Sequence, residues 1–508
     1  MVQEQPAIGI DLGTTTSMVG YVVNGTPIIL PNERGNLSTP SVVAFRDHQT
    51  AWVGELARNL MLGRDREKIV AYPKRFIGTD KRYKIEGREY SPSEIAVIIL
   101  RKLKNLAARY LCIAENEIRK AILTVPAHFN DSQRLAMLKA SKLAGFDDIK
   151  LVSEPVAVAV AHGYLEHPGS ERMLVFDLGG GSLDVTLIEL HDGSFYIKGT
   201  GGSDSAGGIF FDRALAGFLA RRFEELCGID FINDPVLYQN LINIAERTKI
   251  DLSFVEETEV LFPYLIPGNK NKKSYLNVRV SRSHFERITS ENYQEIRNTV
   301  MDVFKRSSIV PGWVSRVLLA GGASRMPGVR KLLSEIFPPG VRIEDPGNAE
   351  KSVVLGASVL AGMMYNPDKL SSLELKNVTS QHLGLEDNDG EMIVIIPRGT
   401  PYPLEVTKTF TTAMDNESEV IIHIIQSGDT DKGSRYQSLG QITLKGLPPA
   451  RAGEPNIPVT FVVDEYGVLK VMAMHPKNGK YLELTTKVGQ GGKIATKPER
   501  RGTGLRVV

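Results

Sequence analysis

Two aspartates stand where apolar runs meet glycines, and each is followed by hydroxyl side chains. Asp11 lies in "IGIDLGTTTS" (8–17), and Asp177 lies in "LVFDLGGGSLDV" (174–185). A carboxylate at the buried end of a strand is costly unless a cation or hydrogen-bond donors balance it. The neighbouring glycines allow tight turns whose N–H groups bind phosphate oxygens. The pattern therefore predicts two hairpins that bracket a polyphosphate, with Asp11 and Asp177 holding the water shell of Mg²⁺.

A single glycine-rich hairpin with one aspartate is also consistent with an ordinary tight turn. The repetition of Asp-Leu-Gly and a third glycine turn, "VLLAGGASRMPG" (317–328), favour a nucleotide site over that alternative. The chain contains no GxxxxGK[ST] motif and no GxGxxG after its first strand. The P-loop and Rossmann classes therefore lack their key feature.

The elements that position these residues alternate between strands and helices up to about residue 365. The pattern predicts a strand over 120–129 and a helix over 131–145 with Asp131 as its N-cap. Such alternation predicts an α/β fold with helices packed on sheets. Both Asp-Leu-Gly strands continue directly into another strand, so each half begins with a hairpin. We expect one nucleotide-binding domain over 1–365, built from two duplicated lobes.

The pattern of apolar and polar residues changes after residue 366. A polar stretch over 366–379 is predicted to be a linker, and residues 380–488 show period-two alternation interrupted by turn formers. That alternation predicts an all-β sandwich. Residues 489–508 are rich in Gly and Arg without periodicity, which predicts a disordered basic tail.

Composition narrows the class of protein further. The 508 residues carry a net charge of +2, which does not indicate nucleic acid or a membrane surface as a partner. Two distant cysteines without CxxC spacing favour reduced thiols over a disulfide or metal site. The sequence begins without a signal-peptide pattern and contains no apolar run of membrane-spanning length. We expect a cytoplasmic protein.

The motifs together resemble those of the DnaK-type, seventy-kilodalton heat-shock chaperones, which belong to the actin-like ATPase superfamily. The resemblance extends to about residue 488 and is carried by "GIDLGTTTS", "PKRFIG", "TVPAHFNDSQR", "SEPVAVAVAHG", "FDLGGGSLDVT" and "LLAGGASRMP". It implies a duplicated, RNase H-like ATPase domain followed by a β-sandwich that binds peptides. The helical lid that follows this sandwich in the family is expected to be absent.

The resemblance also implies roles for individual residues, with ATP or ADP and Mg²⁺ as the ligands. The residues matching the family's catalytic group are Lys74, Glu154, Asp177 and Asp11. Those matching its phosphate loops are Gly13, Thr14, Thr15, Gly179, Gly180 and Ser182. Those matching its nucleoside side are Gly207, Gly208, Glu246, Lys249, Ser253, Gly321, Gly322, Arg325 and Glu350.

In the sandwich the resemblance implies a groove for an extended apolar peptide of an unfolded protein. The matching positions are Leu385, Phe410, Ala413, Val420 and Ile422, for which ordinary sandwich core is the alternative. Pro126 and Arg134 match the family's relay between nucleotide and sandwich. Other partners implied are a J-domain co-chaperone and a nucleotide exchange factor.

The linker departs from the family's pattern. The family's apolar run appears here as Leu373-Glu374-Leu375-Lys376-Asn377, whose charges are expected to weaken docking on the ATPase lobes. Asn377 and Lys150 replace an Asp and an Arg that help the family to bind J-domains, which puts that partnership in question.

Three functions are consistent with these features. The favoured one is an ATP-hydrolysing chaperone in which nucleotide state regulates peptide binding. The second is a nucleotide-gated binding or scaffold protein with little turnover, which the polar linker favours. The third, a small-molecule kinase of the same superfamily, is disfavoured by the sandwich over 380–488.

Overall fold

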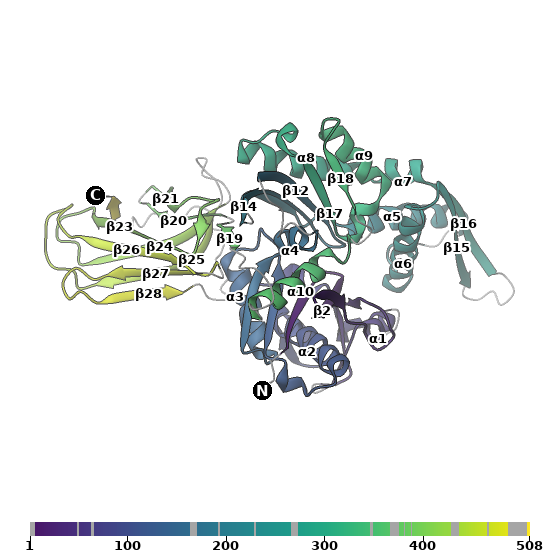
Figure 1. Ribbon diagram of the computed structural model, residues 1–508, viewed down its shortest axis with the longest axis horizontal. Coiled ribbons are helices and arrows are strands. Elements are labelled where there is room, and N and C mark those ends of the chain that lie inside the picture. The colour runs from purple at the N-terminus through teal and green to yellow at the C-terminus, as the bar shows by residue number, and fades with distance from the viewer. Residues whose placement is uncertain are drawn as a thin grey trace.

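A computed structural model describes most of the chain (Figure 1). The described residues are 6–47, 50–61, 66–162, 170–191, 194–227, 230–265, 273–345, 349–365, 375–379, 381–387, 389–427, 436–464, 467–485 and 505–507. They form an α/β body with two lobes and an elongated β-sandwich that projects to one side of it (Figure 1). This arrangement confirms the predicted fold class.

The first lobe is built on a six-stranded sheet in the order β11–β10–β1–β2–β3, with β4 also paired to β2. Its strands are β1 (Ala7–Leu12), β2 (Thr16–Val23), β3 (Thr26–Ile29), β4 (Thr39–Pro40), β10 (Lys120–Val125) and β11 (Asp148–Ser153). β1 is parallel to β10 and antiparallel to β2. The predicted hairpin at the first Asp-Leu-Gly is therefore the β1–β2 turn.

The second lobe repeats this succession as β18–β17–β12–β13–β14. Its strands are β12 (Ser170–Leu178), β13 (Leu183–His191), β14 (Ser194–Ser203), β17 (Arg316–Ala320) and β18 (Arg342–Glu344). β12 is parallel to β17 and antiparallel to β13, so it corresponds to β1. The predicted duplication is confirmed, and Asp11 and Asp177 occupy equivalent places in the two sheets.

Helices cover both faces of these sheets. Two of them, α4 (Glu154–Ala161) and α10 (Ser352–Tyr365), lie between the lobes in one apolar cluster with both sheets. They meet so closely that a Cβ on Gly356 would lie 1.8 Å from the carbonyl oxygen of Ala157. The outer helices are α2 (Pro92–Leu111) and α3 (Asp131–Leu143) on the first lobe, and α5 (Gly208–Cys227), α6 (Pro235–Asp251), α7 (Arg282–Ile288), α8 (Ser290–Ser307) and α9 (Pro327–Ile336) on the second.

Smaller elements extend each lobe outward. They are α1 (Glu55–Leu60), β5 (Val42–Phe45), β6 (Ala51–Val53), β7 (Ile69–Ala71), β8 (Tyr83–Ile85), β9 (Arg88–Tyr90), β15 (Glu257–Leu265) and β16 (Lys273–Ser281). One local prediction is wrong: the N-cap of α3 is Asn130 rather than Asp131. The Asn130 side chain accepts from the Gln133 N–H, and Gln133 returns a bond to the Asn130 N–H, which forms a capping box.

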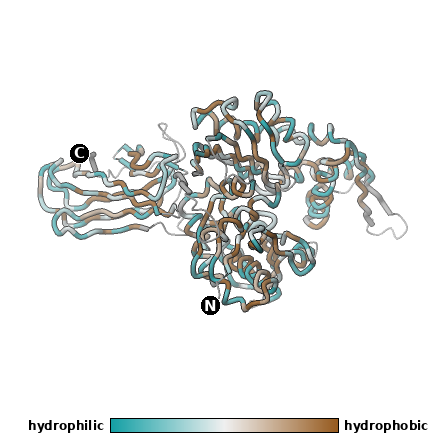
Figure 2. The backbone as a smooth tube through the Cα atoms, in the orientation of Figure 1, coloured by the Kyte–Doolittle hydropathy of each residue, from teal (hydrophilic) through white to brown (hydrophobic). Residues whose placement is uncertain are grey.

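The sandwich stacks two antiparallel sheets, β21–β20–β24–β25 and β28–β27–β26–β23–β29. Its strands are β20 (His382–Glu386), β21 (Met392–Ile396), β23 (Leu404–Thr412), β24 (Glu419–Ser427), β25 (Gln437–Lys445), β26 (Ile457–Val463), β27 (Leu469–Met474), β28 (Tyr481–Thr485) and β29 (Leu505–Val507). Hydrophobic segments run through its strands and through the interior of both lobes (Figure 2). The described residues after Tyr365 include strands and turns but no helix.

The linker joins the sandwich to the second lobe through main-chain pairing. Strand β19 (Leu375–Val378) pairs in parallel with β14 and antiparallel with β22 (Pro401–Tyr402), so the second lobe's sheet has seven strands. The bonds of this pairing come from the backbone, and the expected weakening of docking by the linker's charges stays a prediction. The rest of the predicted linker, 366–374, lies outside the described residues.

The expectation of a disordered tail does not hold at its far end. Residues Leu505–Val507 form β29, which pairs with β23, whereas 486–504 lie outside the described residues.

Candidate functional site

A cavity of about 340 Å³ opens between the two lobes. Both Asp-Leu-Gly turns, the third glycine turn and one face of α6 line it. Every residue predicted for the catalytic, phosphate and nucleoside positions lines this cavity except Gly207. Gly207 lies behind the second glycine turn, where a Cβ would come within 2.4 Å of the Gly181 carbonyl carbon.

The two glycine turns face each other across the cavity. A Cβ on Gly180 would lie 2.4 Å from the Thr15 side chain, and one on Gly181 would lie 2.3 Å from Thr14. Only glycine allows this approach, and it brings backbone N–H groups and threonine hydroxyls from both lobes to one place. This geometry is that of a clamp for an anion with several phosphate groups.

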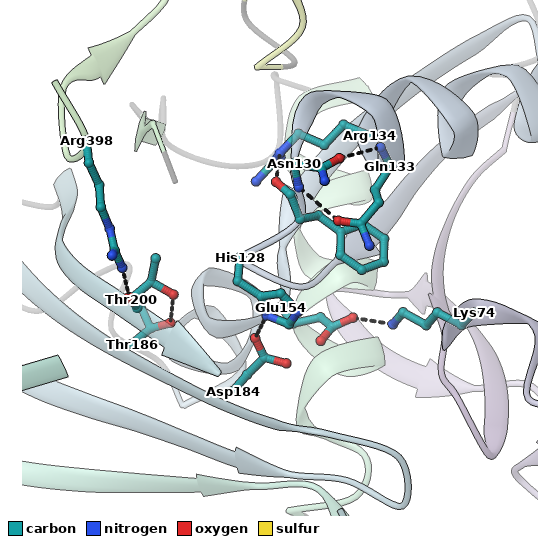
Figure 3. A network of polar contacts seen from close by, with 11 residues as sticks. Lys74, His128, Asn130, Gln133, Arg134, Glu154, Asp184, Thr186, Thr200 and Arg398 are labelled. Atoms are coloured by element: carbon teal, nitrogen blue, oxygen red, sulfur yellow. Dashed lines mark hydrogen bonds and ion pairs between the residues drawn. The ribbon is translucent and has the colours of Figure 1, made fainter. Parts of the chain in front are cut away.

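Lys74 enters the cavity from a short 3₁₀ turn, Pro73–Phe76, that follows Tyr72 in left-handed conformation. Its Nζ lies 2.6 Å from Glu154 Oε1 at the N-terminus of α4, and both side chains are buried (Figure 3). Burial opposes the lysine charge, but the carboxylates of Glu154 and Asp11 outweigh it and raise the pKa of Lys74. The ammonium group is therefore held charged inside the cavity.

The floor of the cavity carries an excess of negative charge. Burial raises the pKa of Asp11 against the opposing effect of Lys74. Burial, then Glu154 and Asp184, raise the pKa of Asp177 well above its usual range. Burial likewise raises the pKa of Glu154 to about 7, although Lys74 opposes the shift. Carboxylates crowded in this way favour a bound cation.

This floor fits a hydrated Mg²⁺ ion that also contacts phosphate oxygens, because oxygen ligands with retained water are what Mg²⁺ prefers. Among the described residues, no three His, Cys, Asp or Glu side chains are grouped as a ready metal cage. A magnesium ion held mainly through waters and phosphates needs no such cage.

One member of the polar network has no signal in the sequence. His128 Nδ1 lies 2.5 Å from Asp184 Oδ1, and the Asp184 side chain is only 4% exposed (Figure 3). Burial lowers the pKa of His128, but the charge and hydrogen bond of Asp184 outweigh it and raise the pKa to about 9. His128 is therefore an imidazolium ion that balances Asp184 at the edge of the cavity.

The nucleoside side of the cavity is formed largely by α6. Lys249 Nζ lies 2.8 Å from Asp212 Oδ1 and donates to the Gly208 carbonyl, which fixes it beside the second lobe's turn. Glu246 pairs with Arg58 of α1 and so links the two lobes beside the cavity. Further residues that line the cavity, beyond the predicted site residues, are Thr16, Met18, Ser38, Gly181, Asp184, Ile250, Phe254, Ala323, Met326 and Val353.

Ile250 of α6 and Phe254, which follows the end of that helix, line the cavity and are 49% and 73% exposed, respectively. Apolar side chains left open to a cavity suit the face of a planar base. In the sequence, Ile250 directly follows Lys249 and Phe254 directly follows Ser253, and this adjacency to predicted site residues was the available signal.

The third glycine turn completes the opposite wall. Gly321 has φ +74°, and a Cβ there would lie 2.3 Å from the Leu178 carbonyl oxygen and 2.5 Å from Asp177 Oδ1. Arg325 faces Asp345 at 3.7 Å, and Gly322 and Glu350 also line the cavity.

Polar contacts connect the α/β body to the sandwich near this site. Asn130 Nδ2 donates to Gln437 Oε1 at 3.2 Å, and Gln426 donates to the same oxygen at 2.8 Å. Arg398 of the sandwich donates to the Thr200 carbonyl of β14 (Figure 3). Arg134 is buried, and its Cδ is 3.4 Å from the Cβ position of Gly467 in a sandwich turn. The loop that carries His128 therefore touches both bodies.

The other linking positions lie nearby. Pro126 accepts a turn bond from the Phe129 N–H. Lys150 stacks its ammonium group 5.5 Å from the centre of the Tyr365 ring, and Asn377 pairs with Tyr402 in the β19–β22 ladder.

Four of the five predicted peptide-site residues lie in the core of the sandwich. Leu385, Phe410, Val420 and Ile422 are fully buried members of its core cluster. Ala413 is half-buried directly after β23. Full burial is what the alternative of ordinary sandwich core predicts, and a peptide-binding role for these residues stays a prediction.

The family model described as "Hsp70 protein" matches residues 7–499. Two proteins named "Chaperone protein DnaK", from two strains of Thermus thermophilus, are each 36% identical over 502 residues, covering 94% of this chain and 80% of the relative. No helix of the described residues is long and apolar enough to cross a membrane. The chain therefore belongs to the Hsp70 family of ATP-hydrolysing chaperones.

Proposed function

We propose that the chain hydrolyses ATP in the cavity between its lobes and uses the bound nucleotide to regulate how the sandwich holds extended apolar peptides. The observation that carries this proposal is the pair of glycine turns facing each other over a buried lysine and a carboxylate cluster. The proposed domains are 1–365 for the nucleotide and 380–488 for the peptide, with 366–379 as the linker.

In this proposal the phosphates lie between the two glycine turns. The backbone N–H groups of Gly13, Gly179 and Gly180 and the hydroxyls of Thr14 and Thr15 bind their oxygens. Asp11 and Asp177 hold Mg²⁺ through its waters, and the ion supplies charge neutralisation on the phosphates. Gly207 and Gly208 support the ribose side, while Glu246, Lys249, Ser253 and Arg325 surround the nucleoside.

Hydrolysis requires a water to form a bond to the γ-phosphorus while the bond from that phosphorus to the β,γ-bridging oxygen breaks. Lys74 places its positive charge where the transferred phosphoryl oxygens gain negative charge. Glu154 has a pKa near 7 and so is able to accept the proton released by the attacking water. The products are ADP and inorganic phosphate.

The sandwich is proposed to bind an extended segment of an unfolded polypeptide at Leu385, Phe410, Ala413, Val420 and Ile422. Main-chain pairing supplies affinity in such sites, and an apolar pocket supplies selectivity. The contacts of Asn130, Arg398 and β19 provide a physical route between the two bodies. J-domain and exchange-factor partners and a cytoplasmic location are further parts of the proposal.

The test measures ATP turnover with and without an extended apolar peptide for the wild type, Lys74→Ala and Lys84→Ala. Lys84 is the matched control because its side chain is 82% exposed. We expect Lys74→Ala to keep nucleotide binding and to lose about 10²- to 10³-fold in turnover, because one preorganised charge donor is removed. Lys84→Ala should match the wild type.

The outcomes separate the alternative functions. Turnover that rises with peptide supports the chaperone. Nucleotide binding without turnover, and equal peptide release in ATP and ADP, would support the scaffold. Phosphate transfer to a sugar would support the kinase.

A further inference from the structure

Strand β23 would be the edge of its sheet over Phe410–Thr412 if β29 were not there. The sheet order is β28–β27–β26–β23–β29, so β26 occupies one side of β23 and β29 the other. β29 runs antiparallel with Phe410 opposite Val507, Thr411 opposite Arg506 and Thr412 opposite Leu505. An open edge of this kind accepts an extended chain through its unpaired N–H and C=O groups.

This edge coincides with the proposed peptide site. Phe410 belongs to that site, Ala413 directly follows the paired residues, and β29 also lies against β24, the strand that carries Val420 and Ile422. The backbone of β29 therefore lies along the edge where a client peptide would add as a strand. A client and β29 cannot pair with the same three residues at once.

The sequence of the segment has the chemistry expected of a client. "LRVV" (505–508) combines apolar residues, two of them β-branched, with a single basic residue. Such residues favour extended conformation. We infer that Leu505–Val507 is an internal ligand of the peptide site, which competes with client peptides for the edge of β23. This inference rests on the proposed function.

Tethering makes such competition effective even when the segment binds weakly. Because the segment belongs to the same chain as the site, its effective concentration at this edge is taken as about 1 mM. A segment with its own Kd of about 0.2 mM would then raise the apparent Kd of a client about sixfold.

The segment is also an imperfect ligand. The buried hydroxyls of Thr411 and Thr412 have no hydrogen-bond partner among the described residues. A client that supplies such partners would displace it.

The experiment uses the full chain with two matched variants. In an antiparallel strand only every second residue donates its N–H to a given neighbour, so either Arg506 or Val507 donates to β23. Proline has no N–H, and the double variant Arg506→Pro/Val507→Pro therefore removes a hydrogen bond to β23 in either case. Arg506→Ala keeps every N–H and serves as the control. The probe is a fluorescein-labelled heptapeptide with three central leucines, and its Kd is measured by anisotropy with ADP.

We expect the double-proline variant to bind the probe at least threefold more tightly than the wild type, and Arg506→Ala to stay within twofold of it. A labelled RGTGLRVV peptide, which copies residues 501–508, should bind the double-proline variant and be displaced by unlabelled probe. A peptide RGTGLPPV should not bind.

Equal probe affinity in all three proteins, together with no binding of RGTGLRVV, would overturn the inference while leaving the proposed function intact. If RGTGLRVV binds and the leucine probe binds none of the proteins, the proposed preference for apolar clients fails and the internal ligand stands. If neither peptide binds any of the proteins, both fail.

Discussion

Replacing His128 with glutamine should remove a stabilisation that the wild-type chain itself loses at alkaline pH. The pKa of His128 is about 6.5 in an unfolded chain and about 9 beside Asp184. The difference of about 2.5 units corresponds to about 3.4 kcal/mol of unfolding free energy. Because the side chain is 27% exposed, solvent screening lowers the expected contribution to about 2–3 kcal/mol.

The direction of the His128 pKa shift determines the pH range in which this stabilisation is lost. The folded pKa lies above the unfolded one, so the stabilisation is fully present below pH 6.5 and is lost as the pH rises through 9. Between pH 6.5 and 9.5 the wild type should therefore lose about 2–3 kcal/mol that His128→Gln does not lose. At pH 9.5 the two proteins should have nearly equal stability.

The assay is urea unfolding at pH 6.5, 8 and 9.5, followed by tryptophan fluorescence. Both tryptophans, Trp52 and Trp313, lie in the α/β body and so report on the lobes that His128 joins. Asp184→Asn and the double variant complete a cycle that isolates the pair from other titrating groups. A stability difference between wild type and His128→Gln that stays constant across this range would refute the reasoning.

Three further predictions concern other contacts. Gly207→Ala should weaken ADP binding at least about tenfold by calorimetry, because its Cβ would collide with the second glycine turn. Gly217→Ala in the helix that follows should bind ADP normally, because its Cβ would meet only the Arg221 guanidinium at 4.0 Å. Gly356→Ala should lower thermal stability by about 3 kcal/mol or more, because its Cβ would overlap the Ala157 carbonyl between α10 and α4. Gln437→Ala should reduce peptide stimulation of ATP turnover about two- to tenfold, since it removes one neutral hydrogen bond between the bodies; unchanged stimulation would show that this bond carries no coupling.

The fold class and the gathering of the site residues follow from local sequence. Asp11 and Asp177 end apolar strands and are followed by glycines, so each hairpin is specified within about a dozen residues. The repeat of that pattern specifies two lobes, and equivalent strand ends in two facing sheets come together. Glu246 and Lys249 lie about one turn apart on α6, and Ser253 follows the end of that helix, so all three reach the cavity for a similarly local reason.

The remaining features depend on residues that are distant in sequence. Nothing near His128 marks it as the partner of Asp184, because the two come from different lobes. Asn130 and Asp131 are both good caps, and only the main chain at Asn130 has the extended conformation that a cap needs. The pairing of β29 depends on an edge formed almost a hundred residues earlier, which no periodicity in the tail indicates.

The double pairing of β19 has a mechanical consequence. Two residue pairs join it to β14 and two join it to β22, so tension between a client held in the sandwich and the nucleotide lobes is borne by this short ladder together with the Asn130–Gln437 and Arg398–Thr200 contacts. The few backbone hydrogen bonds of β19 are expected to break before the larger sheets of the lobes do. The strand would then separate from its neighbours while the lobes stay closed on their nucleotide. When single molecules are stretched between the sandwich and the first lobe, we expect a low-force step before the lobes unfold. In that step the pairing of β19 breaks and protects the nucleotide lobes from the applied force.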